Sequence, residues 1–175
     1  MTSVVIGVGN EFRRDDGVGP AVARAVAASG VHAEISDGDP VRLMEAWDGA
    51  AVVVIVDAVL CTDAIPGHWH RTTLPHTVPA ASSHGLGVPE AVELAEALDR
   101  RPERLVIYAV EVADISFGTG LTPAVAAVVA PLTASVLAEF PENTRSARDL
   151  GHSRRRAAGA KFAQGRPPER RERRP

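Results

Sequence analysis

The chain has very little cysteine. Cys61 is the single cysteine among 175 residues, so a disulfide within the chain is impossible, and the composition suits a reducing compartment. The N-terminal residues also lack the basic segment and the small-residue cleavage site of a signal peptide. We therefore expect a cytoplasmic protein.

A long uncharged run needs a separate explanation, because residues 115–138 carry no charge and reach the length of a membrane span. Gly118, Gly120, Pro123 and Pro131 interrupt the run, and much of the remainder is weakly apolar alanine. This composition favours a loop followed by a buried helix, with no membrane partner.

Charge is distributed unevenly along the chain. Residues 1–144 carry 8 basic and 19 acidic side chains, a net of −11, whereas residues 145–175 carry 11 and 3, a net of +8. The acidic body argues against a fold built to bind nucleic acid. Because the apolar pattern stops near residue 143, we predict one domain over residues 1–143 and a basic, disordered tail over 144–175.

Short β-branched runs alternate with segments of helical periodicity. The predicted strands are 3–8, 31–36, 51–56, 68–73 (at a sheet edge) and 105–112, and the predicted helices are 17–29, 41–47, 89–99 and 123–140. This alternation predicts an α/β fold, a three-layer sandwich with a mainly parallel sheet of about five strands and helices on both faces. Binding sites in such folds form beyond the carboxyl ends of the strands.

The first loop is similar to a dinucleotide-binding loop only at its start. Gly7 and Gly9 follow the first strand, but Phe12 stands where the third glycine is needed, and Asp15 and Asp16 occupy the position of a pyrophosphate. We therefore expect no nucleotide cofactor. One of the two aspartates is expected to cap the following helix, which leaves the other as a candidate ligand.

Three polar residues are expected to converge at the carboxyl edge of the sheet. Asp16 follows the first strand, Asp57 ends the third, and His84 lies in the loop before the third helix. Two carboxylates held close together repel each other unless a cation lies between them, and two carboxylates with one imidazole suit nickel or zinc. The alternatives are a turn-capping role for Asp57 and a surface position for His84.

Four motifs in order resemble the hydrogenase maturation endopeptidases, cytoplasmic proteases that process the large subunit of nickel–iron hydrogenases. They are Val4-Val5-Ile6-Gly7-Val8-Gly9-Asn10 with Asp15-Asp16-Gly17-Val18-Gly19, then Val56-Asp57-Ala58, Ser83-His84-Gly85-Leu86-Gly87, and Gly120-Leu121-Thr122-Pro123-Ala124-Val125. The resemblance covers roughly residues 3–140. It implies that Asp16, Asp57 and His84 are both the metal ligands and the catalytic residues.

The resemblance also implies a reaction and a partner. Such an enzyme removes a C-terminal extension from the hydrogenase large-subunit precursor after nickel insertion, so the nickel is supplied by the substrate. The turn Asp37-Gly38-Asp39-Pro40 departs from the family's Asp-Gly-Gly-Thr at its last two positions, and Asp37 is expected to help bind substrate. We expect a monomer. The alternative function is a non-catalytic nickel-binding checkpoint or chaperone module for hydrogenase assembly.

Two further features are interpreted as structural. Cys61 has no neighbouring histidine in the sequence to activate it, so it is not expected to be a nucleophile. His68 and His70 alternate along a predicted strand with a spacing that suits a metal, but no third ligand lies nearby in the sequence. They are interpreted as part of a solvated edge.

Overall fold

The computed structural model describes residues 2–73 and 87–140. It contains five strands and four α-helices, together with a 3₁₀ helix at Arg14–Gly17. In chain order the other elements are β1 Ser3–Val8, α1 Val18–Ala28, β2 Ala33–Ser36, α2 Pro40–Ala46, β3 Val52–Val59, β4 Trp69–Thr73, α3 Val88–Ala97, β5 Arg104–Glu111 and α4 Pro123–Leu137.

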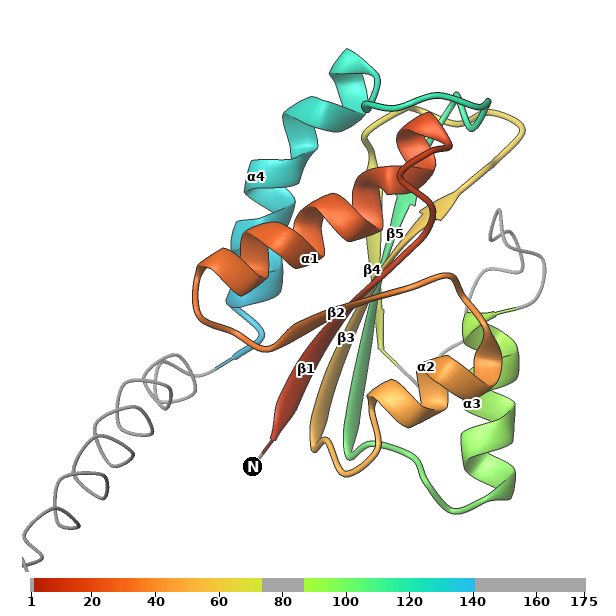
Figure 1. Cartoon of the computed structure of the whole chain (residues 1–175), viewed down its shortest axis with the longest axis vertical. Coiled ribbons are helices and arrows are strands. Elements are labelled where there is room, and N and C mark those ends of the chain that lie inside the picture. The colour runs from red at the N-terminus through yellow and green to blue at the C-terminus, as the bar shows by residue number, and fades with distance from the viewer. Residues whose placement is uncertain (1, 74–86, 141–175) are drawn as a thin grey trace, which may run out of the picture.

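The five strands form one sheet in the order β2-β1-β3-β5-β4. Neighbouring strands are parallel except at one edge, where β4 runs antiparallel to β5 (Figure 1). The predicted mainly parallel α/β sheet with an edge strand near residues 68–73 is therefore confirmed. Parallel neighbours require crossover connections, and α1, α2 and α3 lie in the segments that return the chain to the start of the next parallel strand.

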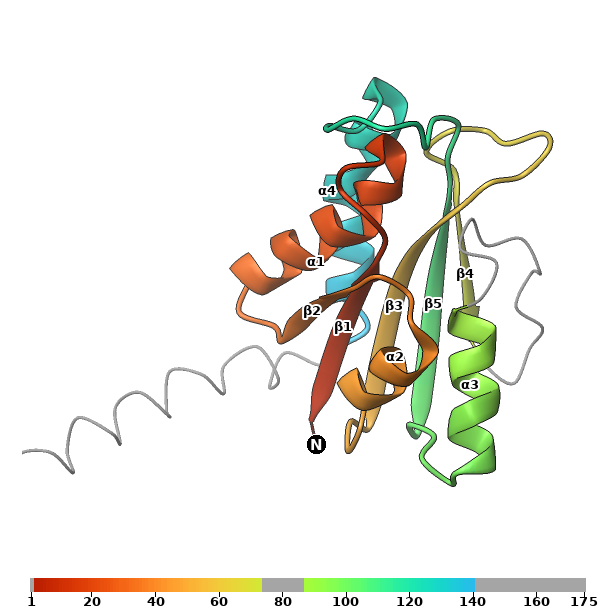
Figure 2. The same ribbon diagram turned by 45° about the vertical axis from the view of Figure 1, so that its right-hand side comes forward.

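Helices cover both faces of the sheet and create two separate cores. Helices α1 and α4 pack together on one face, and α2 and α3 pack together on the other (Figure 2). Because side chains alternate along a strand, Val54 and Val56 of β3 enter the α1/α4 core, whereas Val53 and Ile55 enter the α2/α3 core. This arrangement confirms the predicted three-layer sandwich.

Strand β3 is longer than the sequence pattern indicates. It continues to Val59, so Asp57 lies within the strand and not after it. Ladder pairing with β5 extends the strand, since Asp57 lies opposite Ala109 and Val59 opposite Glu111. The apolar run alone could not reveal this extension, because Asp57 interrupts it.

Two predictions from the sequence fall on residues outside the described ranges. The tail from residue 144 onward lies there, so the division into residues 1–143 and 144–175 stays a prediction. His84 lies there as well. Within residues 2–73 and 87–140, no helix combines the length and the apolar character that crossing a bilayer requires.

Candidate active site

Asp16 lies in the 3₁₀ helix that follows β1, and its side chain is almost fully buried. The Asn10 backbone N–H donates to Asp16 Oδ2 over 2.9 Å, which ties the carboxylate to the turn after the strand. Gly9 makes this close approach possible, because a Cβ there would lie 2.0 Å from the Asp16 carbonyl oxygen and its φ is +138°. The turn therefore fixes Asp16 at the carboxyl end of β1.

Asp15 has a different environment from its neighbour. Its Oδ1 accepts the Thr122 N–H over 2.7 Å, and its Oδ2 accepts the Thr122 hydroxyl over 3.0 Å and the Asp114 N–H over 3.3 Å. The predicted capping of α1 by one of the aspartates is wrong, because Gly17 is the N-cap and makes no side-chain cap. Asp15 instead joins the loop after β1 to the start of α4.

Asp57 is also buried, at the carboxyl end of β3. Gly7 of β1 lies opposite Val56, so Asp57 occupies the next position beside the end of β1. The 3₁₀ helix that carries Asp16 packs against β3. Both predicted carboxylates are thus buried on adjoining elements at one edge of the sheet, with Oδ1 of each shielded from solvent.

Asp37 lies at the end of β2 and is exposed. It lines a surface pocket of about 350 Å³ with Gly9, Ser36 and Arg42, which places it at the same edge of the sheet as Asp16. Asp39, two residues later, has a structural task. Its Oδ1 accepts the Arg42 N–H over 3.0 Å and so caps α2, and Pro40 lies in the first turn of that helix. The unusual Asp39-Pro40 pair therefore builds the start of α2.

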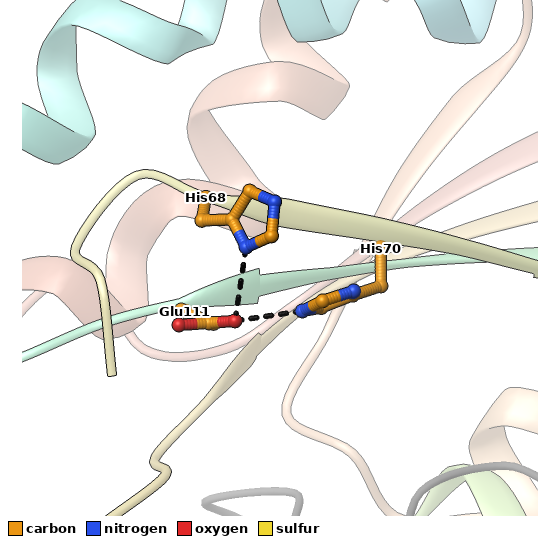
Figure 3. A group of neighbouring side chains, drawn as sticks. All are labelled: His68, His70 and Glu111. Atoms are coloured by element: carbon orange, nitrogen blue, oxygen red, sulfur yellow. Dashed lines mark hydrogen bonds and ion pairs between the residues drawn. The ribbon is translucent and has the colours of Figure 1, made fainter. Parts of the chain in front are cut away.

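A cluster that sequence reasoning missed lies at the end of β5. Glu111 contacts His70 of the adjacent edge strand β4 and His68 just before that strand (Figure 3). Hydrogen bonds from His70, from the Ile65 N–H and from His68 lower the pKa of Glu111 to about 2. The alternating histidines were visible in the sequence as two possible ligands. The third, Glu111, is 41 residues from His70 in the sequence and lies beside it only because the two strands pair.

Similarity to known proteins identifies the family. A family model of hydrogenase maturation proteases matches residues 35–139, a segment that includes Asp57 and begins after Asp16. The hydrogenase 2 maturation protease of Escherichia coli (strain K12) is 27% identical over 153 residues, which cover 82% of this chain and 93% of that protein.

Solved structures agree with the sequence match. The NiFe hydrogenase maturation protease HybD from Thermococcus kodakarensis superposes with a TM-score of 0.68 at 25% identity, covering 78% of this chain and 97% of that one. An endopeptidase from Escherichia coli gives a TM-score of 0.68 at 26% identity, with 79% and 91% covered. The chain therefore belongs to the hydrogenase maturation protease family and is a peptidase.

Proposed function

We propose that this peptidase removes the C-terminal extension from the nickel-loaded large-subunit precursor of a nickel–iron hydrogenase. The observation that carries the proposal is the pair of buried carboxylates, Asp16 and Asp57, on adjoining elements at the carboxyl edge of the sheet. Family membership supports the same conclusion, because relatives are named as maturation proteases and endopeptidases. The enzyme acts as a cytoplasmic monomer in this proposal.

The two carboxylates recognise the nickel that the substrate carries. Asp16 is held by the Asn10 N–H, so its position is set before substrate arrives. Carboxylate oxygens bind divalent cations, and a buried site strengthens that interaction relative to water. His84 supplies an imidazole as the third ligand, as the family resemblance implies. Nickel belongs to the substrate here, and the peptidase contributes ligands that orient the adjoining peptide bond.

Asp37 has a separate role in this proposal. Its exposed carboxylate borders the 350 Å³ pocket at the end of β2, beside Gly9. A peptide segment of the precursor that reaches Asp16 from this side passes Asp37. Its contribution is therefore to substrate binding, and Asp37→Asn is expected to raise KM more than it lowers kcat.

The test measures cleavage of purified nickel-loaded precursor by mass loss at its C-terminus. Asp16→Asn, Asp57→Asn and His84→Ala should each lower the rate about 100-fold or more, because misplacement of reacting groups by about 1 Å has an effect of that size. Asp48→Asn is the matched control. Asp48 is an exposed carboxylate paired with Arg100 in the turn before β3, at the opposite end of that strand from Asp57, and the variant should cleave normally.

Two outcomes would contradict the proposal. Undiminished cleavage by Asp16→Asn and Asp57→Asn would remove the carboxylates from the mechanism. Tight binding of the precursor by the wild-type protein without any mass loss would instead support the non-catalytic checkpoint module.

Cys61→Ser should cleave normally, since the proposed chemistry does not use that exposed thiol. Loss of cleavage only in this variant would indicate a thiol protease.

A further inference from the structure

The cluster of His68, His70 and Glu111 places three metal-binding groups around one point. His68 Nδ1 lies 3.2 Å from Glu111 Oε1, and His70 Nε2 lies 2.6 Å from the same oxygen (Figure 3). One ligand atom from each residue lies within 4.8 Å of the other two. Ligand bonds of about 2 Å put neighbouring ligand atoms of a tetrahedral zinc ion about 3.4 Å apart. Small side-chain rotations therefore suffice to admit an ion.

Strand pairing holds these residues in place before any ion binds. The Gly67 N–H donates to the Glu111 carbonyl over 2.9 Å, and the Glu111 N–H donates to the His68 carbonyl over 2.8 Å. His70 follows in the same ladder, opposite Ala109. His68 and His70 lie two residues apart on β4 and its N-terminal extension, so both side chains leave the same face of the sheet.

Glu111 is oriented as a metal-binding carboxylate would be. Its Oε2 accepts the Ile65 N–H over 2.6 Å, which leaves Oε1 directed at both imidazoles. Outer hydrogen bonds of this kind fix the orientation of metal ligands. The Glu111 side chain is 11% exposed, whereas those of His68 and His70 are 53% and 49% exposed. The histidine side of the cluster is therefore the side that is open to solvent.

We propose that His68, His70 and Glu111 form a divalent-cation site for zinc-class ions, separate from the substrate's nickel. Two imidazoles with one carboxylate and an open position match the ligand types of a zinc site. The chain offers a contrast in His32 and Glu34, an exposed pair at 3.1 Å. That pair has a single imidazole and therefore lacks the second histidine of the proposed site.

The site lies on the same face of the sheet as Asp57. Asp57 of β3 is opposite Ala109 of β5, and Ala109 is opposite His70 of β4, so the three residues form one row across three strands. Two strand spacings put the backbones of Asp57 and His70 about 10 Å apart. A bound ion would connect the edge strand β4 to β5 beside the candidate active site. This effect of the ion does not depend on the proposed cleavage reaction.

The experiment titrates the purified full-length protein with Zn²⁺ against a chromophoric chelator. The wild-type protein should show a site that His70→Ala and Glu111→Gln each weaken at least about tenfold, the effect expected from loss of a ligand or its support. His32→Ala should bind as the wild type does. Asp16→Asn/Asp57→Asn should also retain the site, which separates this cluster from the substrate-nickel ligands.

Thermal melting provides an independent measurement. Because a ligand that binds only the folded state stabilises it, Zn²⁺ should raise the melting temperature of wild type and His32→Ala more than that of His70→Ala. His70 is half exposed, so its replacement leaves no core cavity. Equal zinc affinity and stoichiometry in wild type and His68→Ala/His70→Ala would overturn the proposal. Absence of zinc binding by the wild-type protein would overturn it as well.

Discussion

At the residue scale, two adjacent aspartates have different tasks. Asp15 satisfies three donors from distant loops, namely two on Thr122 and one on Asp114, whereas Asp16 accepts from the nearby Asn10 N–H. Asp15 therefore has a stabilising task, whereas Asp16 is the proposed nickel ligand. The pair looks equivalent in the sequence, and only the partners separate them.

Asp15→Asn is expected to lower the free energy of unfolding by about 1–3 kcal/mol. An amide offers one acceptor oxygen, so its NH₂ group faces at least one part-buried donor that loses its partner. Urea denaturation measures the change. Asp16→Asn keeps an acceptor for the Asn10 N–H and should unfold within about 1 kcal/mol of wild type. A larger loss in Asp16→Asn than in Asp15→Asn would reverse the assignment.

At the element scale, α1 packs directly on the strand ends that carry the site. A Cβ at Gly19 would lie 2.2 Å from the Val8 carbonyl oxygen and 2.6 Å from that of Val56. Backbone atoms cannot move aside as a flexible side chain can, so the helix would have to shift. Asp16 lies three residues before Gly19 and would shift with it.

Gly19→Ala is therefore expected to destabilise the fold by about 1–3 kcal/mol through overpacking and to slow precursor cleavage as well. Gly49→Ala is the matched control. Gly49 has open space around its Cβ position but a φ of +69°, so its cost of about 1–2 kcal/mol comes from backbone strain alone. Melting curves and cleavage rates should show that only Gly19→Ala affects both properties. Normal cleavage by Gly19→Ala would contradict this argument.

Helix α4 is joined to the sheet edge by a carboxylate just after its end. Glu139 accepts from Arg71 Nε of β4 over 2.7 Å and from the Tyr108 hydroxyl of β5 over 2.8 Å, and it also pairs with Arg104. The Arg71 hydrogen bond is the main cause that lowers the pKa of Glu139, followed by the Tyr108 hydroxyl. These contacts connect α4 to both β4 and β5.

A lowered carboxyl pKa has a defined consequence for pH dependence. The stabilisation that the Glu139 carboxylate gives is complete above pH 4.5, the ordinary pKa of a glutamate. It is lost as pH falls below that value, because the unfolded chain then binds a proton more readily than the folded one. The melting temperature of wild type should thus fall more steeply below about pH 4.5 than that of Glu139→Gln. Parallel pH profiles for the two proteins would show that Glu139 contributes nothing through its charge.

At the scale of the whole molecule, the described sheet and its four helices already enclose two complete cores. Phe140 is buried in the α1/α4 core at the end of the second described range. We predict that a chain ending at residue 143 melts at the same temperature as the full chain and cleaves precursor at the same rate. A drop in melting temperature on truncation would show that the basic segment contributes to stability.

The sequence by itself determined the architecture of this protein. β-Branched runs predicted all five strands, and the helical periodicity of residues 123–140 predicted α4. Such periodicities depend only on which side chains face a core, so they are visible locally. The order of elements then favours parallel crossovers for β1, β2 and β3, and the parallel arrangement places Asp16 and Asp57 at one edge of the sheet.

The tertiary structure alone decided which polar groups meet. The partners of Asp15 lie about 100 residues away, and Glu111 joins His68 and His70 only because β4 pairs antiparallel with β5. No local pattern encodes such pairings, since they depend on strand order and register across the whole sheet. The physical reason is that the periodicity of apolar residues indicates only which face of a helix or strand is buried. A site depends instead on which residues from separate strands lie side by side in the sheet.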